Sequence, residues 1–188
     1  MSARSKGRRK RWPVVLVAVL LVAGAAALGA YWVQLRLYPY DLQPVIEQAA
    51  ARYGLDPLFV AAVIRTESNF RADARSGVGA LGLMQIMPDT GEWIAGKNDW
   101  SYSDDMLLDG GYNIEMGCWY LNYLFGRFDS DTMLALAAYN AGEGTVRKWV
   151  QQGGIGVNGE DIPFAETRNF VKRVLNAYEV YKRLYPKK

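Results

Sequence analysis

The feature that most constrains this chain is a run of twenty uncharged, largely apolar residues from Val14 to Val33. A helix of that length, rising about 1.5 Å per residue, crosses the roughly 30 Å hydrocarbon core of a bilayer. Trp12 on one side and Tyr31, Trp32 and Tyr38 on the other fit the aromatic belts found at membrane interfaces. A buried core helix is the alternative, but runs this long without charges are rare in soluble folds.

Basic residues at 4–11 precede the run, and the run is longer than the apolar region of a usual signal peptide. We therefore expect an uncleaved anchor whose N-terminus is cytoplasmic, because positive charge stays inside. Small residues from Ala25 to Ala30 leave a cleaved signal peptide open. Both interpretations export the rest of the chain. The expected division is a cytoplasmic basic segment at 1–12, a membrane anchor at 13–34, a short linker at 35–43 and one domain at 44–188.

Charge is distributed unevenly along the sequence. Seven of the 22 Lys and Arg residues precede residue 41 and no acidic residue does, so the remainder carries 15 basic and 19 acidic residues. The formal net charge of +3 therefore comes from the N-terminal segment. A mildly acidic domain without a basic face is a poor candidate for binding nucleic acid, and we expect no nucleic-acid partner.

The chain contains no histidine, and Cys118 is its single cysteine. This composition excludes Ser-His-Asp and Cys-His nucleophile systems, His-rich zinc sites and an internal disulfide. Proton transfer is left mainly to carboxylates, lysine and tyrosine. We expect neither a metal nor another cofactor, and we expect Cys118 to be a small buried hydrophobe.

Capping and stop signals predict a mainly α domain. Asp41 is expected to cap a helix that runs to Tyr53, and Asp56 followed by proline to open another that ends near Asn69 or Phe70. Sustained alternation of period two is absent, so little sheet is expected. Further helices are expected at about 88–95, 109–125, 130–139, 143–151 and 165–184, with a loop or small hairpin at 153–163.

A glutamate interrupts the apolar stripe of the helix that starts at residue 57. Val60, Val63, Ile64 and Phe70 follow at spacings of three and four, and Glu67 occupies a position on the same stripe. A carboxyl group that faces the core loses solvation, which raises its pKa above about 4.3. Such a group can hold a proton near neutral pH and donate it as a general acid. The spacing alone also fits an ordinary glutamate with its end in water.

The Gly-rich segment 76–88 follows this helix. Its glycines let the backbone approach a ligand closely, Met84 and Met87 supply pliant apolar surface, and Gln85 can hydrogen-bond to sugar hydroxyls or amides. A structural turn into the core is the alternative interpretation. The segment is not a phosphate loop, because the Lys-Ser/Thr pair that would complete one is missing.

Two later segments complete the candidate site. Tyr139 and Asn140 project from the end of a helix that Gly142 closes, and helix ends often carry site residues. Glu166 lies in the first turn of the expected C-terminal helix, near the positive end of its dipole.

The motifs ES, GLMQIMP, AYNAG and IPFAETRNF, in this order and spacing, resemble the catalytic domain of the soluble lytic transglycosylase family over about Val45 to Tyr185. The resemblance implies a lysozyme-like α fold, and makes the domain at 44–188 a catalytic one. It implies that Glu67 is the catalytic residue. It also implies a substrate-binding surface formed by Ser76, Gln85, Met87, Tyr139, Asn140 and Glu166. One departure is Phe170, where many relatives carry tyrosine, so ring packing is kept but a hydroxyl is lost.

The resemblance implies that the substrate is the peptidoglycan glycan strand. The β-1,4 bond between N-acetylmuramic acid and N-acetylglucosamine would be cleaved by one acid/base residue, with a 1,6-anhydro product and no water consumed. A goose-type lysozyme that uses water is the first alternative, favoured if Asp73 or Asp89 faces Glu67. A non-catalytic glycan-binding domain is the second, but a binder needs no buried acid.

Overall fold

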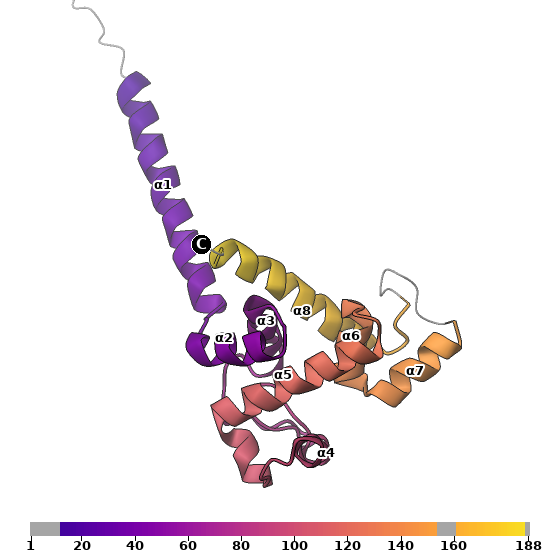
Figure 1. Ribbon diagram of the computed structural model, residues 1–188. Helices are drawn as coiled ribbons and strands as arrows, with labels where there is room; N and C mark the ends of the chain where they lie inside the picture. Colours follow the sequence, from indigo (N-terminus) through magenta and orange to yellow (C-terminus); the bar gives the residue numbers. More distant parts are fainter. Residues whose placement is uncertain (1–11, 154–160, 187–188) are drawn as a thin grey trace, which may run out of the picture. The chain divides into compact units, whose positions relative to one another are not determined.

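The computed structural model describes residues 12–153 and 161–186, and helix dominates both ranges (Figure 1). The chain divides into two compact units at the boundary between Leu37 and Tyr38. The loop or hairpin expected at 153–163 falls mostly on residues 154–160, which lie outside the described residues.

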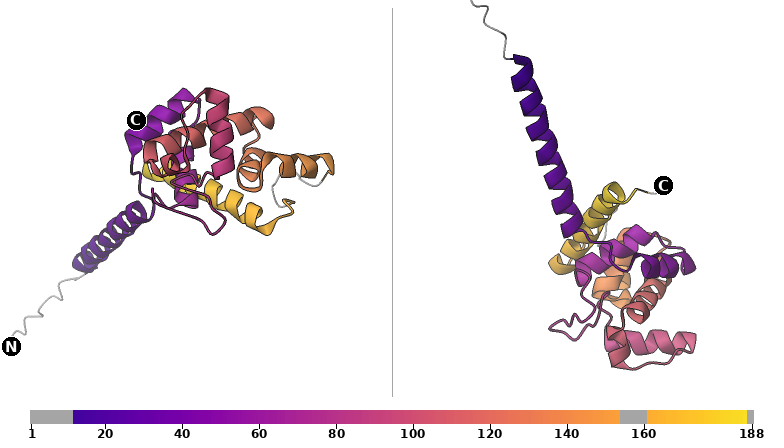
Figure 2. Two further views of the ribbon diagram at one scale, coloured as in Figure 1. Left: turned by 90° about the horizontal axis from the view of Figure 1, so that it is seen from below. Right: turned by 90° about the vertical axis from the view of Figure 1, so that its left-hand side faces the viewer.

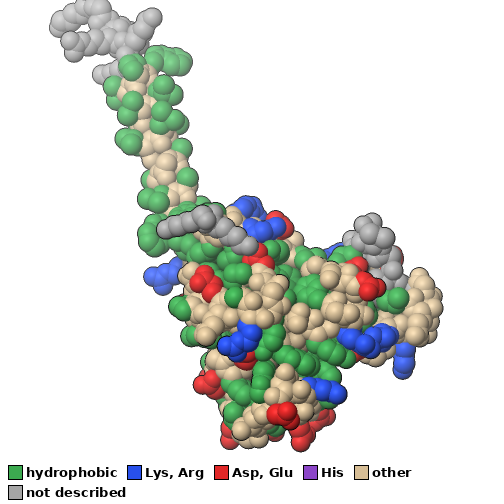
Figure 3. Space-filling view, in the orientation of Figure 1, with side chains coloured by type: hydrophobic (Ala, Val, Ile, Leu, Met, Phe, Trp, Pro, Cys, Tyr) green, Lys and Arg blue, Asp and Glu red, His purple; other side chains and the backbone are tan. Residues whose placement is uncertain are grey.

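The first unit contains helix α1, Trp12–Leu37, with 26 residues. None of its residues is buried, and nearly all of the side chains it exposes are apolar (Figure 3). Within the described parts of the chain, α1 is the one helix that is long and apolar enough to cross a membrane. It contains the whole segment 13–34 that the sequence predicts as an apolar helix.

The second unit is the helical domain, seen from two further sides in Figure 2. Among its described residues, β pairing is limited to two isolated antiparallel bridges, so the mainly α prediction is confirmed. Its elements are α2 Gln43–Arg52, α3 Pro57–Glu67, α4 Pro88–Asn98, the 3-10 helix η1 Asp104–Leu108, α5 Gly110–Arg127, α6 Thr132–Ala141, α7 Glu143–Gln151 and α8 Ala165–Leu184.

Helix α3 forms the centre of the domain. Every residue from Leu58 to Ile64 is buried, so this helix is surrounded by apolar neighbours on all sides. It packs along α8 and against α2. The ring of Phe59 meets Tyr178 of α8 edge to face at 5.5 Å and Phe125 of α5 at 5.8 Å. The helix that carries Glu67 at its end is therefore packed against three other helices.

Two helix ends differ from the sequence-based prediction. Asp41 does not cap α2; the N-cap is Leu42, in a left-handed conformation with φ 56° and without a side-chain cap. Helix α3 ends at Glu67, earlier than expected, because Asn69 and Phe70 are left-handed with φ of 52° and 63°. Such values are costly for residues other than glycine, so packing of the surrounding chain must hold this turn.

The domain also begins earlier than the sequence indicates. Tyr38, expected in a membrane-interface belt, lies in the second unit, where Arg65 stacks 4.0 Å from its ring centroid. Tyr185 donates a hydrogen bond to the Tyr38 carbonyl at 2.9 Å, and Tyr181 donates to the Pro39 carbonyl at 2.6 Å. The end of the expected linker thus packs on α8 as part of the folded domain.

The difference between the two expected caps can be measured. Asp56 accepts a hydrogen bond from the Leu58 amide at 2.8 Å, as predicted, whereas Asp41 is exposed and makes no cap bond. Asp56→Ala should lower the free energy of unfolding by at least about 0.5–2 kcal/mol, because it removes this cap and also the hydrogen bond between Asp56 and Tyr178. Asp41→Ala should change it by no more than about 0.5 kcal/mol. Urea unfolding of the full chain in detergent, followed by tryptophan fluorescence, measures both, and equal losses would contradict the assignment.

Candidate active site

Glu67 is the last residue of α3, at the point where the helix leaves the core. The predicted apolar stripe is confirmed up to this point, since Val60, Val63 and Ile64 are fully buried. Glu67 itself is only partly exposed. Its carboxyl group therefore lies at the edge of the core, neither inside it nor free in water.

The surroundings of Glu67 favour its neutral form. Burial raises the pKa of Glu67 from 4.5 to about 8, and the positive charge of Arg173 opposes this shift only in part. Within the described residues, no carboxylate contributes to the shift and the Glu67 side chain makes no hydrogen bond. At neutral pH the carboxyl group is therefore mostly protonated and has a proton to donate.

The Gly-rich segment after α3 folds back on itself. Antiparallel bridges join Arg75 to Leu81 and Leu81 to Ile86. The Ser76 hydroxyl accepts a hydrogen bond from the Ala80 amide at 2.9 Å. Ser76, predicted to line the site, thus also closes the turn in which it lies.

Asn113 of α5, which the sequence analysis missed, fastens this loop to the domain. Its side chain is fully buried and donates to the carbonyls of Leu81 at 3.0 Å and Leu107 at 2.8 Å, while its Oδ1 accepts from the Met84 amide at 2.7 Å. Gly82, with φ 78°, lies so close that a Cβ atom would overlap the Leu107 carbonyl and the Asn113 amide. Asn113 lies among apolar residues of the expected 109–125 helix, and a polar side chain at such a position is the signal that could have identified it.

Gln85 adopts a left-handed conformation with φ 49° and supports the loop from inside. Its Nε2 donates to the Gly82 carbonyl at 2.8 Å and to the Ala74 carbonyl at 3.3 Å. The described hydrogen bonds do not use its Oε1, so this atom can accept from a ligand. Met87, two residues after Gln85 and 40% exposed, presents apolar surface, whereas Met84 is buried.

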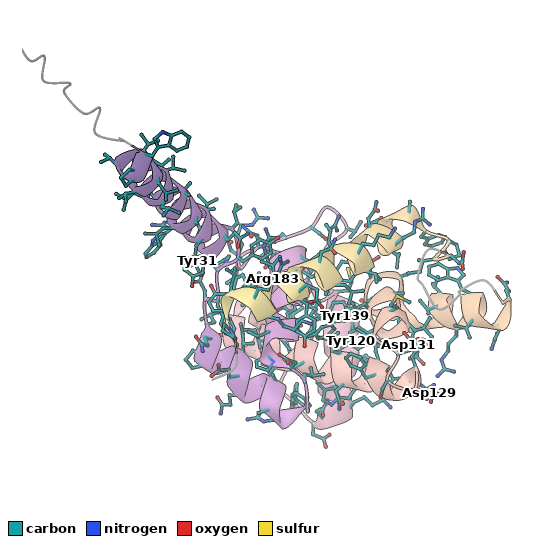
Figure 4. All side chains as sticks on the ribbon, turned by 90° about the horizontal axis from the view of Figure 1, so that it is seen from above. Tyr31, Tyr120, Asp129, Asp131, Tyr139 and Arg183 are labelled. Atoms are coloured by element: carbon teal, nitrogen blue, oxygen red, sulfur yellow. The ribbon has the colours of Figure 1, made fainter. Side chains whose placement is uncertain are left out.

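Tyr139 joins the loop to α6 and α8. Its hydroxyl donates to the Met84 carbonyl at 2.8 Å. Its ring lies parallel to Phe170 of α8, with centroids 6.4 Å apart, and 5.4 Å from Tyr120 of α5, beside which Figure 4 shows it. Burial raises the pKa of Tyr139, and the charge of Glu67 raises it further. The structure thus brings Tyr139 within electrostatic reach of Glu67, and the ring packing expected of Phe170 is present.

The remaining predicted residues are less closely joined to Glu67. Asn140 is partly buried beside Tyr139, at the helix end that Gly142 closes with φ 87° as expected. Glu166 is exposed in the first turn of α8. Within the described residues, no hydrogen bond or ion pair connects it to Glu67.

A group of aromatic side chains beside Tyr139 also escaped the sequence analysis. Tyr120 and Tyr123, one turn apart on α5, lie nearly parallel at 6.3 Å, and Trp93 of α4 meets Tyr123 edge to face at 5.1 Å. A pocket of about 290 Å³ is lined by Asp89, Thr90, Trp93, Tyr120, Tyr123 and Glu143. This pocket adjoins the predicted site through the contact of Tyr120 with Tyr139, although none of the predicted site residues lines it, and none lines the two larger cavities of about 570 and 530 Å³.

Metal ligands are not clustered in the described residues, where no group of three or more His, Cys, Asp or Glu side chains could hold an ion. Cys118 is fully buried in the core, as expected, and burial raises the pKa of its thiol. The chemistry of the site therefore rests on the Glu67 carboxyl and the polar groups of the loop around it.

A mainly helical domain with a partly buried glutamate at the end of its central helix is typical of lysozyme-like proteins. The sequence profile of the Transglycosylase SLT domain matches residues 44–157. The chain belongs to this family.

Curated relatives agree with this assignment. The soluble lytic murein transglycosylase of Escherichia coli K12 is 34% identical over 172 residues, covering 86% of this chain and 26% of its own length. The membrane-bound lytic murein transglycosylase C of Serratia proteamaculans is 31% identical over 191 residues, covering 81% of this chain and 52% of its own length. The chain thus spans about a quarter to a half of the length of these relatives.

Solved structures share the fold. An inactive glutamate-to-glutamine mutant of the lytic transglycosylase Slt of Pseudomonas aeruginosa superimposes with a TM-score of 0.72 at 37% identity, over 78% of this chain and 24% of that one. A complex of the 70-kDa soluble lytic transglycosylase with bulgecin A gives a TM-score of 0.77 at 33% identity, over 82% of this chain and 26% of that one. The lysozyme-like fold expected from the sequence is therefore confirmed.

The pKa of Glu67 predicts how stability depends on pH. Between about 4.5 and about 8 the unfolded chain loses the Glu67 proton while the folded chain keeps it, so this group's stabilising contribution falls as pH rises. Glu67→Gln cannot titrate and should become progressively more stable than the wild type across this window. Urea unfolding at pH 5 to 9 measures the difference. Glu166→Gln, at an exposed carboxyl, is the control. A difference between wild type and Glu67→Gln that does not vary with pH would contradict the burial of Glu67.

Proposed function

We propose that this protein is a peptidoglycan lytic transglycosylase that cleaves the β-1,4 bond between N-acetylmuramic acid and N-acetylglucosamine. The observation that carries the proposal is the partly buried carboxyl of Glu67, whose pKa of about 8 keeps it protonated at neutral pH. The names of the relatives, which are lytic murein transglycosylases, support the same reaction.

In the proposed reaction Glu67 acts first as an acid and then as a base. It protonates the glycosidic oxygen while the bond to the anomeric carbon breaks, and the N-acetyl oxygen of the substrate stabilises the positive charge. The Glu67 carboxylate then takes the proton from the sugar's 6-hydroxyl. The 6-oxygen closes on the anomeric carbon and gives the 1,6-anhydro product, and Glu67 is protonated again.

Formation of the anhydro ring is preferred over hydrolysis because nothing described around Glu67 supplies a second carboxylate. A glycoside hydrolase with two carboxyl groups uses the second one either to activate water or to attack the anomeric carbon itself. Asp73 and Asp89, the candidates for such a group, are both exposed, and neither charge contributes to the pKa of Glu67.

The substrate-binding surface would be built from the loop and the helix ends around Glu67. Gln85 would accept a hydrogen bond from a sugar hydroxyl or amide through Oε1, and Met87 would cover an apolar sugar face. Tyr139 would hold the Met84 carbonyl in place and limit the access of water to Glu67. Contributions from Ser76, Asn140 and Glu166 complete the proposed binding surface.

Glu67→Gln tests the mechanism. Glutamine keeps the shape of the side chain but has no proton to give, so turnover should fall by at least about 10²–10⁴-fold, the usual contribution of general acid catalysis. Mass spectrometry of products from purified peptidoglycan should show wild-type muropeptides lighter by one water than hydrolysis products. Glu92→Gln, an exposed glutamate of α4, is the matched control and should remain active.

Reducing-end products from the wild type would convert the assignment to lysozyme-like hydrolysis. Full activity in a folded Glu67→Gln protein would rule out the proposed role of Glu67 as the general acid.

The proposal extends to location. Helix α1 would anchor the chain in the cell membrane with a single pass, leaving the basic segment 1–12 in the cytoplasm and the domain outside. The apolar surface of α1 and the membrane-bound relative support membrane association. Both the linker at 35–43 and the domain bounds at 44–188 are part of the same proposal, although the compact unit already begins at Tyr38.

Topology can be tested directly. A reporter fused to the C-terminus should be accessible from outside the membrane, and the full-length chain should remain in the membrane fraction after washing at high salt. Replacing Leu20 and Leu21, in the middle of α1, by arginine should release or destabilise the anchored form. A shortened soluble protein from the wild type would show that the segment is a cleaved signal peptide.

A further inference from the structure

Arg173 lies on the face of α8 that meets the candidate site. It follows Phe170 by three residues and Glu166 by seven, spacings that bring the three side chains to one side of a helix. Phe170 stacks on Tyr139, whose hydroxyl holds the loop around Glu67. Arg173 is itself exposed, and its charge reaches the Glu67 carboxyl.

Arg173 differs from most arginines of the domain in making no side-chain hydrogen bond, ion pair or ring contact among the described residues, although its charge acts on Glu67. The others bind carboxylates, main-chain carbonyls or an aromatic ring: Arg52, Arg65, Arg71, Arg127, Arg147, Arg168 and Arg183. Glu67 does not neutralise Arg173 either, because that carboxyl is protonated at neutral pH. The guanidinium beside the reacting group is therefore available to an anion from outside the protein.

We propose that Arg173 binds a carboxylate of the muramic acid residue next to the bond that is cleaved, and so positions that sugar on Glu67. This inference rests on the proposed function. Muramic acid differs from glucosamine in its lactyl ether, whose carboxylate is either free or extended by a peptide that carries carboxylates of its own. A guanidinium fork pairs with a carboxylate through two parallel hydrogen bonds, so Arg173 fits this group in charge and in shape.

The charges along α8 predict how the glycan strand is oriented in the site. Glu166, on the same face, lies about 10 Å from Arg173 along the helix axis at 1.5 Å per residue. A carboxylate is attracted at the Arg173 end of this stripe and repelled at the Glu166 end. The muramic acid substituent is therefore expected on the C-terminal side of Phe170.

The test compares three substrates with the full-length protein in detergent. The first is glycan strands with peptide stems, the second is strands stripped by an amidase to expose the lactyl carboxylate, and the third is stripped strands whose carboxylates are converted to neutral amides. Arg173→Gln should raise KM about tenfold on a carboxylate-bearing substrate, as expected for loss of a charge-assisted pair, with little change in kcat. On the neutral substrate, wild type and variant should be alike.

Arg173→Lys keeps the charge but loses the fork, and its KM should be intermediate. Arg183→Gln, near the far end of α8 and labelled in Figure 4, removes a charge of the same kind and should behave as wild type. A KM effect only on stem-bearing strands assigns the carboxylate to the peptide, and an effect only on stripped strands assigns it to the lactyl group.

If Arg173→Gln lowered activity equally on charged and neutral strands, the inference would be overturned. Arg173 would then act only through Glu67, and Arg173→Gln would move the alkaline limb of the kcat profile to higher pH with KM unchanged. Identical kinetics of wild type and Arg173→Gln on all three substrates would also overturn it. Failure of the wild type to cleave any strand is a separate result, because it removes the proposed function itself.

Discussion

The site depends on one buried amide. Asn113 uses both side-chain groups to hold three main-chain positions, two of them in the Gly-rich loop and one at the end of η1. Because its side chain has no exposure to water, each lost partner would leave a buried polar group unsatisfied. These bonds fix Met84, and Met84 in turn offers the carbonyl that Tyr139 binds. The position of Tyr139 relative to Glu67 thus follows from an asparagine on another helix.

The site also depends on the length of α3, because the end of this helix places the Glu67 carboxyl. Its central residues make the domain core, and Phe59 in its first turn packs against α8 and α5, so the helix as a whole is fixed within the domain. The left-handed pair Asn69 and Phe70 ends the helix directly after Glu67. A longer helix would continue the stripe past Glu67, whereas this turn leaves the carboxyl at the boundary between core and solvent. The raised pKa is a consequence of that boundary position.

Much of this arrangement was predictable from local patterns, because those patterns act over one or two turns. The stripe from Val60 to Glu67, the cap at Asp56 and the stop at Gly142 all depend on nearby residues and are confirmed, whereas Phe70 lies beyond the helix end. The cap predicted at Asp41 is wrong, and it shows the limit of local patterns. Leu42 takes a backbone conformation that tertiary packing imposes. Asn113 could not be connected to the loop in advance, because its partners lie up to 32 residues away in sequence.

The desolvated state of Glu67 also determines where the proton of each catalytic cycle comes from. A carboxyl that is neutral before the substrate binds already carries the proton that the proposed reaction needs. It gives this proton to the leaving oxygen, and the 6-hydroxyl of the sugar then gives one proton back. In the proposed reaction the protein would therefore end each turnover in its starting charge state without drawing on buffer or bulk water. An enzyme with this cycle can work while its active site is closed to water, where proton exchange with the solvent would be too slow to protonate the glutamate again.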